Sequence, residues 1–112
     1  MSNEKRPWGS YTVLLNSEVC KVKKISVDSG HRLSYQYHNQ RREVWTIVAG
    51  SGILTLDDVE THVEKESVIE IPIGSKHRIE NTGNEPLIFI EVQTGNYFGE
   101  DDIVRLQDDY RR

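Results

Sequence analysis

Apolar residues in this chain come in short bursts, and turn-forming residues separate one burst from the next. The bursts cover eight ranges: Tyr11–Leu15, Val19–Val27, Leu33–His38, Val44–Val48, Ile53–Leu56, Val68–Ile71, His77–Glu80 and Leu87–Val92. Glycine, proline, aspartate and asparagine stand between them, as in Asp57-Asp58 and Pro72-Ile73-Gly74. Many short strands predict an all-β sandwich or small barrel. Helical periodicity is nearly absent, and only Glu100–Arg112 is a candidate for a short helix or an ordered tail.

Length and charge narrow the class of protein. The 112 residues fit a single domain spanning residues 1–112. Acidic residues outnumber Lys and Arg by 18 to 14, which disfavours nucleic acid as a partner because phosphate backbones select clustered cations. The first residues are polar, and no apolar run approaches the roughly 20 residues of a membrane helix. We therefore expect a cytoplasmic protein without a membrane partner, and its single cysteine, Cys20, excludes an intrachain disulfide.

Four polar side chains have the spacing of a metal site. Strand alternation places Gln36 and His38 on one face, Glu43 opens the next strand, and His77 follows the Pro72-Ile73-Gly74 turn. If these strands are neighbours, one amide, two imidazoles and one carboxylate converge, a set that suits zinc, manganese, iron, cobalt or nickel. The alternative interpretation is that each histidine is an ordinary hydrogen-bonded residue at the rim of the barrel.

The spacing of these residues resembles the two motifs of the cupin superfamily. Gly30-x5-Gln36-x-His38-x4-Glu43-x6-Gly50 resembles the first motif, with Gln36 in the place of the usual first histidine. Glu66-x5-Pro72-x-Gly74-x2-His77-x3-Asn81 resembles the second motif, with Glu66 where a glycine is usual. The resemblance implies a single-domain jelly-roll barrel, also called a double-stranded β-helix.

A closer resemblance, to the type II mannose-6-phosphate isomerase domain, spans nearly the whole chain. It is carried by the following segments: Arg6-Pro7-Trp8-Gly9, Leu33–His38, Arg41–Trp45, His77–Asn81 and Glu91–Arg105. The resemblance implies interconversion of mannose 6-phosphate and fructose 6-phosphate, a sugar phosphate as the small-molecule partner, and a homodimer. In that family the domain often follows a guanylyltransferase domain, for which this chain has no length, so we expect a stand-alone module.

The expected residue roles centre on one divalent metal ion. Gln36, His38, Glu43 and His77 are its expected ligands, with zinc the first choice and cobalt, manganese, nickel or iron as alternatives. For the proton-transferring base the candidates are Glu91 and Asp102, although Glu91 could instead be a carboxylate on an edge strand that faces water. Substrate binding is assigned to Arg41, Gln93 and Arg105, with the two arginines expected to bind the phosphate.

Three other functions remain open at this point. A cupin that binds a sugar phosphate without converting it is favoured by Asn39 and Gln40, which stand where the family commonly has histidines. An iron-dependent cupin oxygenase is a second alternative, although its usual site is richer in histidine. A metal-free structural cupin is the third.

Overall fold

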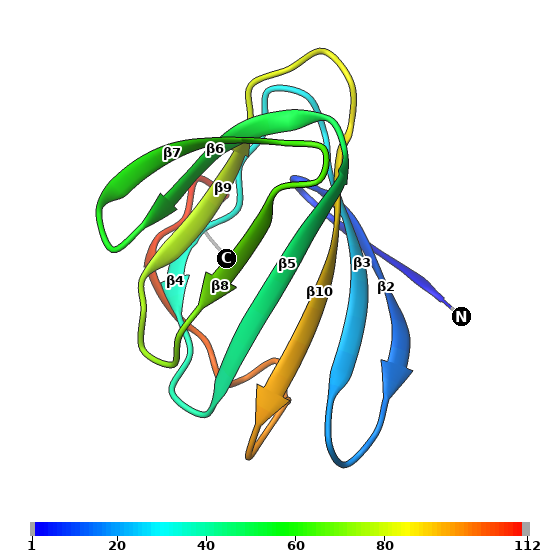
Figure 1. Cartoon of the computed structure of the whole chain (residues 1–112), viewed down its shortest axis with the longest axis vertical. Helices are drawn as coiled ribbons and strands as arrows, with labels where there is room; N and C mark the ends of the chain where they lie inside the picture. Colours follow the sequence, from blue (N-terminus) through cyan, green and yellow to red (C-terminus); the bar gives the residue numbers. More distant parts are fainter. Residues whose placement is uncertain (1, 111–112) are drawn as a thin grey trace.

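Eleven strands in two antiparallel sheets form the architecture of residues 2–110, the part of the chain that the computed structural model describes (Figure 1). The first sheet has six strands in the order β1 (Asn3–Arg6), β2 (Gly9–Asn16), β3 (Lys21–Val27), β10 (Leu87–Gly95), β5 (Arg41–Ala49) and β8 (Val68–Ile71). The second has five strands in the order β11 (Val104–Gln107), β4 (Tyr35–Tyr37), β9 (His77–Asn81), β6 (Ser51–Leu56) and β7 (Val59–Glu64).

The predicted all-β fold is confirmed, and each of the eight apolar bursts overlaps a strand. Three strands, β1, β7 and β11, were not predicted. All three lie at sheet edges, where one side of the strand has no neighbour and most side chains are exposed, so they lack an apolar signal. The helix proposed for Glu100–Arg112 is wrong within the described residues, because Val104–Gln107 is a strand; Arg111 and Arg112 lie outside them.

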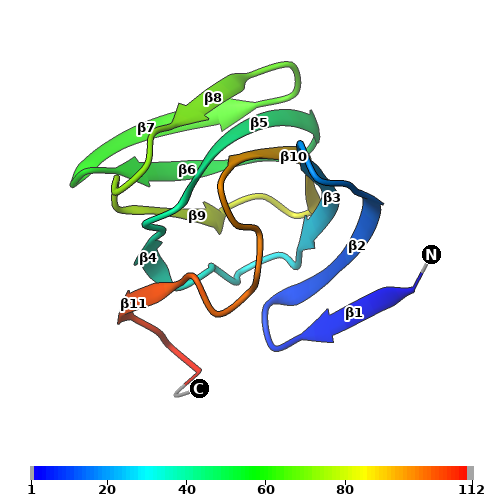
Figure 2. The ribbon, with the colours of Figure 1, turned by 90° about the horizontal axis from the view of Figure 1, so that it is seen from below.

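The hydrophobic core lies between the two sheets, which face each other in the end-on view (Figure 2). Trp45 and Phe89 stack at its centre with ring centroids 4.3 Å apart. Trp8, Ile47, Ile79 and other inward side chains complete the core. Residues 2–110 include no helix long and apolar enough to cross a membrane.

Three loops meet at one end of the barrel and are joined by backbone hydrogen bonds. In the loop after β4, the carbonyl oxygen of His38 accepts a hydrogen bond from Gly74 N (2.8 Å). The carbonyl oxygen of Gln40 in the same loop accepts one from Asn96 N (3.0 Å). Gly95 allows this approach, because a Cβ there would lie 2.2 Å from the Gln40 carbonyl oxygen. The loops that carry His38 and His77 are therefore held side by side.

Glu66 has a φ of 78°, in the left-handed region that favours glycine, and its side chain is exposed. A non-glycine residue pays about 1–2 kcal/mol for this conformation. Glu66→Gly is therefore expected to raise the free energy of unfolding by about 1 kcal/mol, after the extra entropy of glycine in the unfolded chain is subtracted. Urea denaturation would measure it.

The neighbouring exposed residue provides the control. Lys65 is not among the non-glycine residues with positive φ in the described chain, so Lys65→Gly is expected to lower stability by about 0.5–1 kcal/mol. Equal effects of the two glycine substitutions would contradict the strain at Glu66.

Candidate metal centre

The inner face of the six-stranded sheet changes from apolar to polar toward the end where the three loops meet. Cross-strand register aligns positions of β3, β10 and β5 in successive rows: Ile25 with Phe89 and Ile47, then Lys23 with Glu91 and Trp45, then Lys21 with Gln93 and Glu43. All nine residues are buried. Buried ionisable groups are costly unless they have partners, so this end of the barrel is the candidate functional site.

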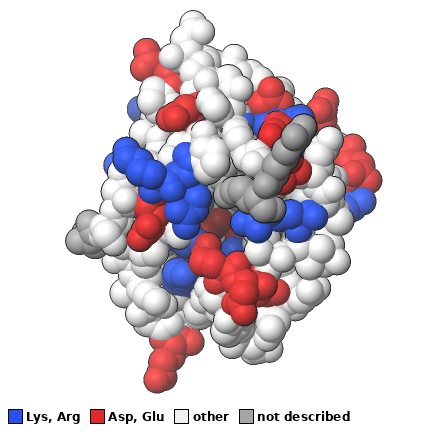
Figure 3. Space-filling view, turned by 180° about the vertical axis from the view of Figure 1, so that it is seen from behind, with Lys and Arg blue, Asp and Glu red and all other residues white. Residues whose placement is uncertain are grey.

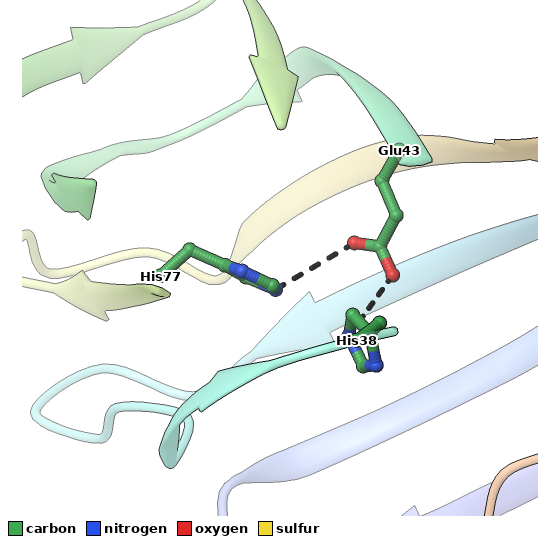
Figure 4. A group of neighbouring side chains, drawn as sticks. All are labelled: His38, Glu43 and His77. Carbon is green, nitrogen blue, oxygen red and sulfur yellow. Dashed lines mark ion pairs between the residues drawn. The ribbon is translucent and has the colours of Figure 1, made fainter. Parts of the chain in front are cut away.

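His38, Glu43 and His77 form one buried cluster at this end. Their candidate ligand atoms all lie within 4.8 Å of one another. Glu43 stands between the two histidines (Figure 4), with its Oε2 3.2 Å from His38 Nε2 and its Oε1 3.8 Å from His77 Nε2. The sequence separates these residues by up to 39 positions, and β5, β9 and the loop after β4 bring them together.

Hydrogen bonds to carbonyl oxygens fix the protonation of both imidazoles. His38 Nδ1 lies 2.6 Å from the Asp102 carbonyl oxygen, and His77 Nδ1 lies 2.9 Å from that of Ser75. A carbonyl oxygen only accepts, so each Nδ1 donates and each Nε2 carries a lone pair. The lone pair of His38 Nε2 accepts from Arg41 Nη2 at 3.3 Å. Burial lowers the pKa of His38 to about 4, helped by the charge of Arg41, and burial also lowers the pKa of His77. Both rings are therefore neutral at neutral pH, the form that binds metals.

The donor atoms fit a divalent cation. His77 Nε2 is buried and has no hydrogen-bond partner within residues 2–110. Glu43 is oriented by Trp45 Nε1, which donates to its Oε1 (2.9 Å), and by Arg41 Nε, which donates to its Oε2 (2.9 Å). Two imidazole nitrogens and a carboxylate oxygen suit zinc, manganese, iron, cobalt or nickel.

Gln36, the predicted fourth ligand, lies beside this cluster. It is paired in register with His77 on β9 and with Arg105 on β11, so the three share one face of the smaller sheet. Its Oε1 accepts a hydrogen bond from Ser34 Oγ at 2.7 Å. Ligation by Gln36 stays a prediction.

Glu91 is an interior residue, so the alternative of an edge carboxylate facing water is wrong. β10 lies between β3 and β5, and Glu91 is 4% exposed. Its Oε1 accepts from Trp45 Nε1 (3.1 Å) and its Oε2 from Gln93 Nε2 (2.7 Å). Burial, followed by the negative charge of Glu43, raises the pKa of Glu91 to about 8. A carboxyl group with this pKa is suited to proton transfer near neutral pH.

Asp102, the second residue predicted as the base, has its carboxylate bound by backbone groups of the loop after β4. Its Oδ1 and Oδ2 accept hydrogen bonds from the backbone N–H groups of Asn39 (3.0 Å) and Gln40 (2.9 Å), and its carbonyl oxygen accepts from His38. Both carboxylate oxygens are thus engaged in holding the loop after β4. The geometry favours Asp102 as a positioning residue for His38.

A cavity of about 80 Å³ adjoins the cluster on the side of Arg41. Four of the predicted site residues line it: Gln36, Arg41, Glu91 and Arg105. Gln93 is fully buried and is not part of the lining. Arg41 is buried, and Arg105 is at the rim with 37% of its side chain exposed.

Sequence reasoning gave no site role to four charged residues of this cavity region: Arg6, Lys21, Lys23 and Glu100. The signal for the lysines is the alternation in Lys21–Val27, which places Lys21 and Lys23 on the same face as Ile25 and Val27. Glu100 carries no such signal, because its place depends on the path of the loop between β10 and β11.

Comparison with known proteins finds relatives along nearly the whole chain. The family described as "Mannose-6-phosphate isomerase C-terminal" matches residues 2–108. The alginate biosynthesis protein AlgA of Pseudomonas aeruginosa is 47% identical over 107 residues, which are 96% of this chain and 22% of that protein. The chain therefore spans about a fifth of the length of this curated relative.

Solved structures with the same fold are more distant in sequence. The capsular polysaccharide assembling protein CapF of Staphylococcus aureus superposes with a TM-score of 0.84 at 22% identity, over 95% of this chain and 34% of that one. A Klebsiella pneumoniae protein with a double-stranded β-helix domain gives 0.75 at 21% identity, over 84% of this chain and 80% of that one. These likenesses confirm the predicted cupin jelly-roll fold.

Proposed function

The chain belongs to the mannose-6-phosphate isomerase C-terminal domain family, and from this premise we propose that it is a metal-dependent isomerase interconverting mannose 6-phosphate and fructose 6-phosphate. The observation that carries the proposal is the buried cluster of His38, Glu43 and His77. Glu91 lies next to it, because Trp45 Nε1 donates to both Glu43 and Glu91. A Lewis-acid site beside a carboxyl group with a raised pKa suits an aldose–ketose isomerisation, which needs a polarised carbonyl and a base.

His38, Glu43 and His77, together with Gln36 as predicted, would hold the metal. When bound, a divalent ion polarises the substrate carbonyl and stabilises the negative charge that develops on its oxygen. Zinc is the first choice, and cobalt, manganese, nickel and iron fit the same donor set.

Glu91 transfers the proton in this proposal. In its ionised form it removes the proton from C2 of mannose 6-phosphate and returns it to C1, while a second proton moves between the two oxygens. The Gln93 amide, which donates to Glu91 Oε2, orients the carboxyl group. Burial keeps bulk water from competing for the proton, and Gln93 acts on the substrate through Glu91.

Arg41 and Arg105 are proposed to bind the phosphate, because both line the cavity beside the cluster and a guanidinium group pairs with two phosphate oxygens. A cupin that only binds a sugar phosphate is the second candidate, favoured by Asn39 and Gln40 in the loop that follows His38.

A coupled assay for fructose 6-phosphate separates these two candidates. We expect the chain, supplied with zinc, cobalt, manganese, nickel or iron(II), to form fructose 6-phosphate from mannose 6-phosphate and to lose this activity after chelation. Binding of mannose 6-phosphate without turnover under every metal would overturn the isomerase proposal in favour of the binding protein. Consumption of oxygen in the iron sample would indicate the oxygenase instead.

A further inference from the structure

Two lysines point into the barrel from β3, where lysine is unusual. Lys21 and Lys23 share the inner face with Ile25 and Val27, and only 9% and 4% of their surfaces are exposed. A buried ammonium group is costly unless an anion compensates it. These residues therefore require a negatively charged partner at this place.

Glu100 supplies that negative charge. Its Oε1 lies 2.8 Å from Lys23 Nζ, and its Oε2 lies 3.3 Å from Lys21 Nζ and 3.9 Å from Arg41 Nη1. These cations lower the pKa of Glu100, although partial burial opposes them, so the carboxylate stays ionised at neutral pH. The loop between β10 and β11, which carries Glu100, crosses the end of the barrel (Figure 2).

One carboxylate does not satisfy this group of cations. Arg41 Nη1 is buried without a hydrogen-bond partner among the residues that the structure describes. Three cations contact Glu100, and Arg6 and Arg105 line the same cavity, in a chain whose net charge is −4. Lys and Arg side chains lie on either side of a central hollow on the face in Figure 3. An anion with more charge and more oxygen atoms than a carboxylate fits this environment better.

The cavity is too small for a sugar phosphate while Glu100 lines it. Its volume is about 80 Å³, whereas sites for small molecules have roughly 300–1,000 Å³. Glu100 is the group best placed to leave, since 49% of its side chain is exposed and its partners stand on rigid strands.

We propose that Lys21, Lys23 and Arg41 Nη1 form the subsite for the phosphate group of the substrate, and that Glu100 occupies this subsite until the phosphate displaces it. A phosphate monoester brings three terminal oxygens, which can accept from these three nitrogens and also from Arg105 at the cavity rim, and about twice the charge of a carboxylate. Arg41 then joins the two halves of the site, since its Nε donates to Glu43 and its Nη1 faces the anion. The assignment of this anion to a phosphorylated sugar rests on the proposed function.

Titration of the full chain with inorganic phosphate by calorimetry, after removal of metals by chelation, tests this subsite. Glu100→Gln removes the competing charge and is expected to tighten phosphate binding about fivefold, because a half-exposed ion pair contributes only modestly. Lys23→Met removes a buried charged contact and is expected to weaken binding on the order of tenfold or more. Lys24→Met is the matched control: Lys24 is exposed on the opposite face of β3, and its loss is expected to leave the affinity unchanged.

If Lys23→Met does not fold, the phosphate affinity of Glu100→Gln alone tests the subsite. An affinity for phosphate that does not rise in Glu100→Gln, or that falls equally in Lys23→Met and Lys24→Met, would overturn the subsite. The KM for mannose 6-phosphate separates this failure from that of the proposed function. If the variants turn over mannose 6-phosphate with an unchanged KM, the subsite is wrong and the isomerase proposal stands. If phosphate binding changes as expected but no variant shows turnover, the subsite stands and the isomerase proposal is wrong.

Discussion

Alanine in place of His38 or of His77 is expected to weaken binding of a divalent cation by more than about 100-fold, because loss of an outer hydrogen-bond partner alone costs about 10- to 100-fold. Each imidazole offers an Nε2 lone pair that a carbonyl oxygen fixes through Nδ1, and no other histidine or acidic residue in the described chain joins the cluster with Glu43. Metal content after dialysis against zinc, measured by elemental analysis, gives the first readout. Calorimetric titration gives the affinity.

His62→Ala is the matched control, because His62 lies exposed on β7, the edge strand of the smaller sheet. Metal is expected to raise the melting temperature of the wild type and of His62→Ala, but not of the two cluster variants. Circular dichroism establishes that each variant is folded. Full metal content in folded His38→Ala and His77→Ala would show that this cluster does not bind the metal, and would contradict the proposed chemistry.

The fold and the three clustered residues follow from local rules that a sequence displays. Alternation along a strand places Glu43 on the face of Trp45 and Ile47, and the turn at Pro72-Ile73-Gly74 places His77 at the start of a strand. Only the pairing of distant strands, such as Gln36 with His77, had to come from the resemblance to a family.

The charged residues around the cluster are less evident in the sequence. Alternation places Lys21 and Lys23 on the face of Ile25, but three lysines within four residues also resemble a solvated stretch. Their partner Glu100 lies 77 to 79 residues away on a loop, and loop paths are set by tertiary contacts. The contacts of Asp102 could not be predicted for the same reason, because only the structure shows the backbone groups of the loop after β4 next to its carboxylate.

Replacing Glu91 with glutamine is expected to lower kcat by about 10²- to 10⁴-fold, the usual contribution of a general base. The substitution removes the group that carries the proton and keeps the size of the side chain. Its hydrogen bonds survive: the new amide oxygen accepts from Trp45 Nε1, and Gln93 can rotate its amide to offer Oε1, which has no partner in residues 2–110. Metal content should therefore equal that of the wild type, and Glu70→Gln on the exposed face of β8 is the control.

The stability of the metal-free protein gives the same substitution a second readout. With a pKa of about 8 in the folded state and 4.5 as the ordinary value, Glu91 holds a proton that the unfolded chain has released between these pH values. Wild-type stability should thus fall as pH rises across this window. The uncharged amide of the Glu91→Gln variant has no proton to release, so the stability advantage of this variant should grow from pH 4.5 toward pH 8. Glu70→Gln should show no such trend. Near-normal turnover of Glu91→Gln would show that Glu91 is not the base. If the stability difference between Glu91→Gln and the wild type does not change with pH, the Glu91 carboxyl group is already ionised in the folded protein.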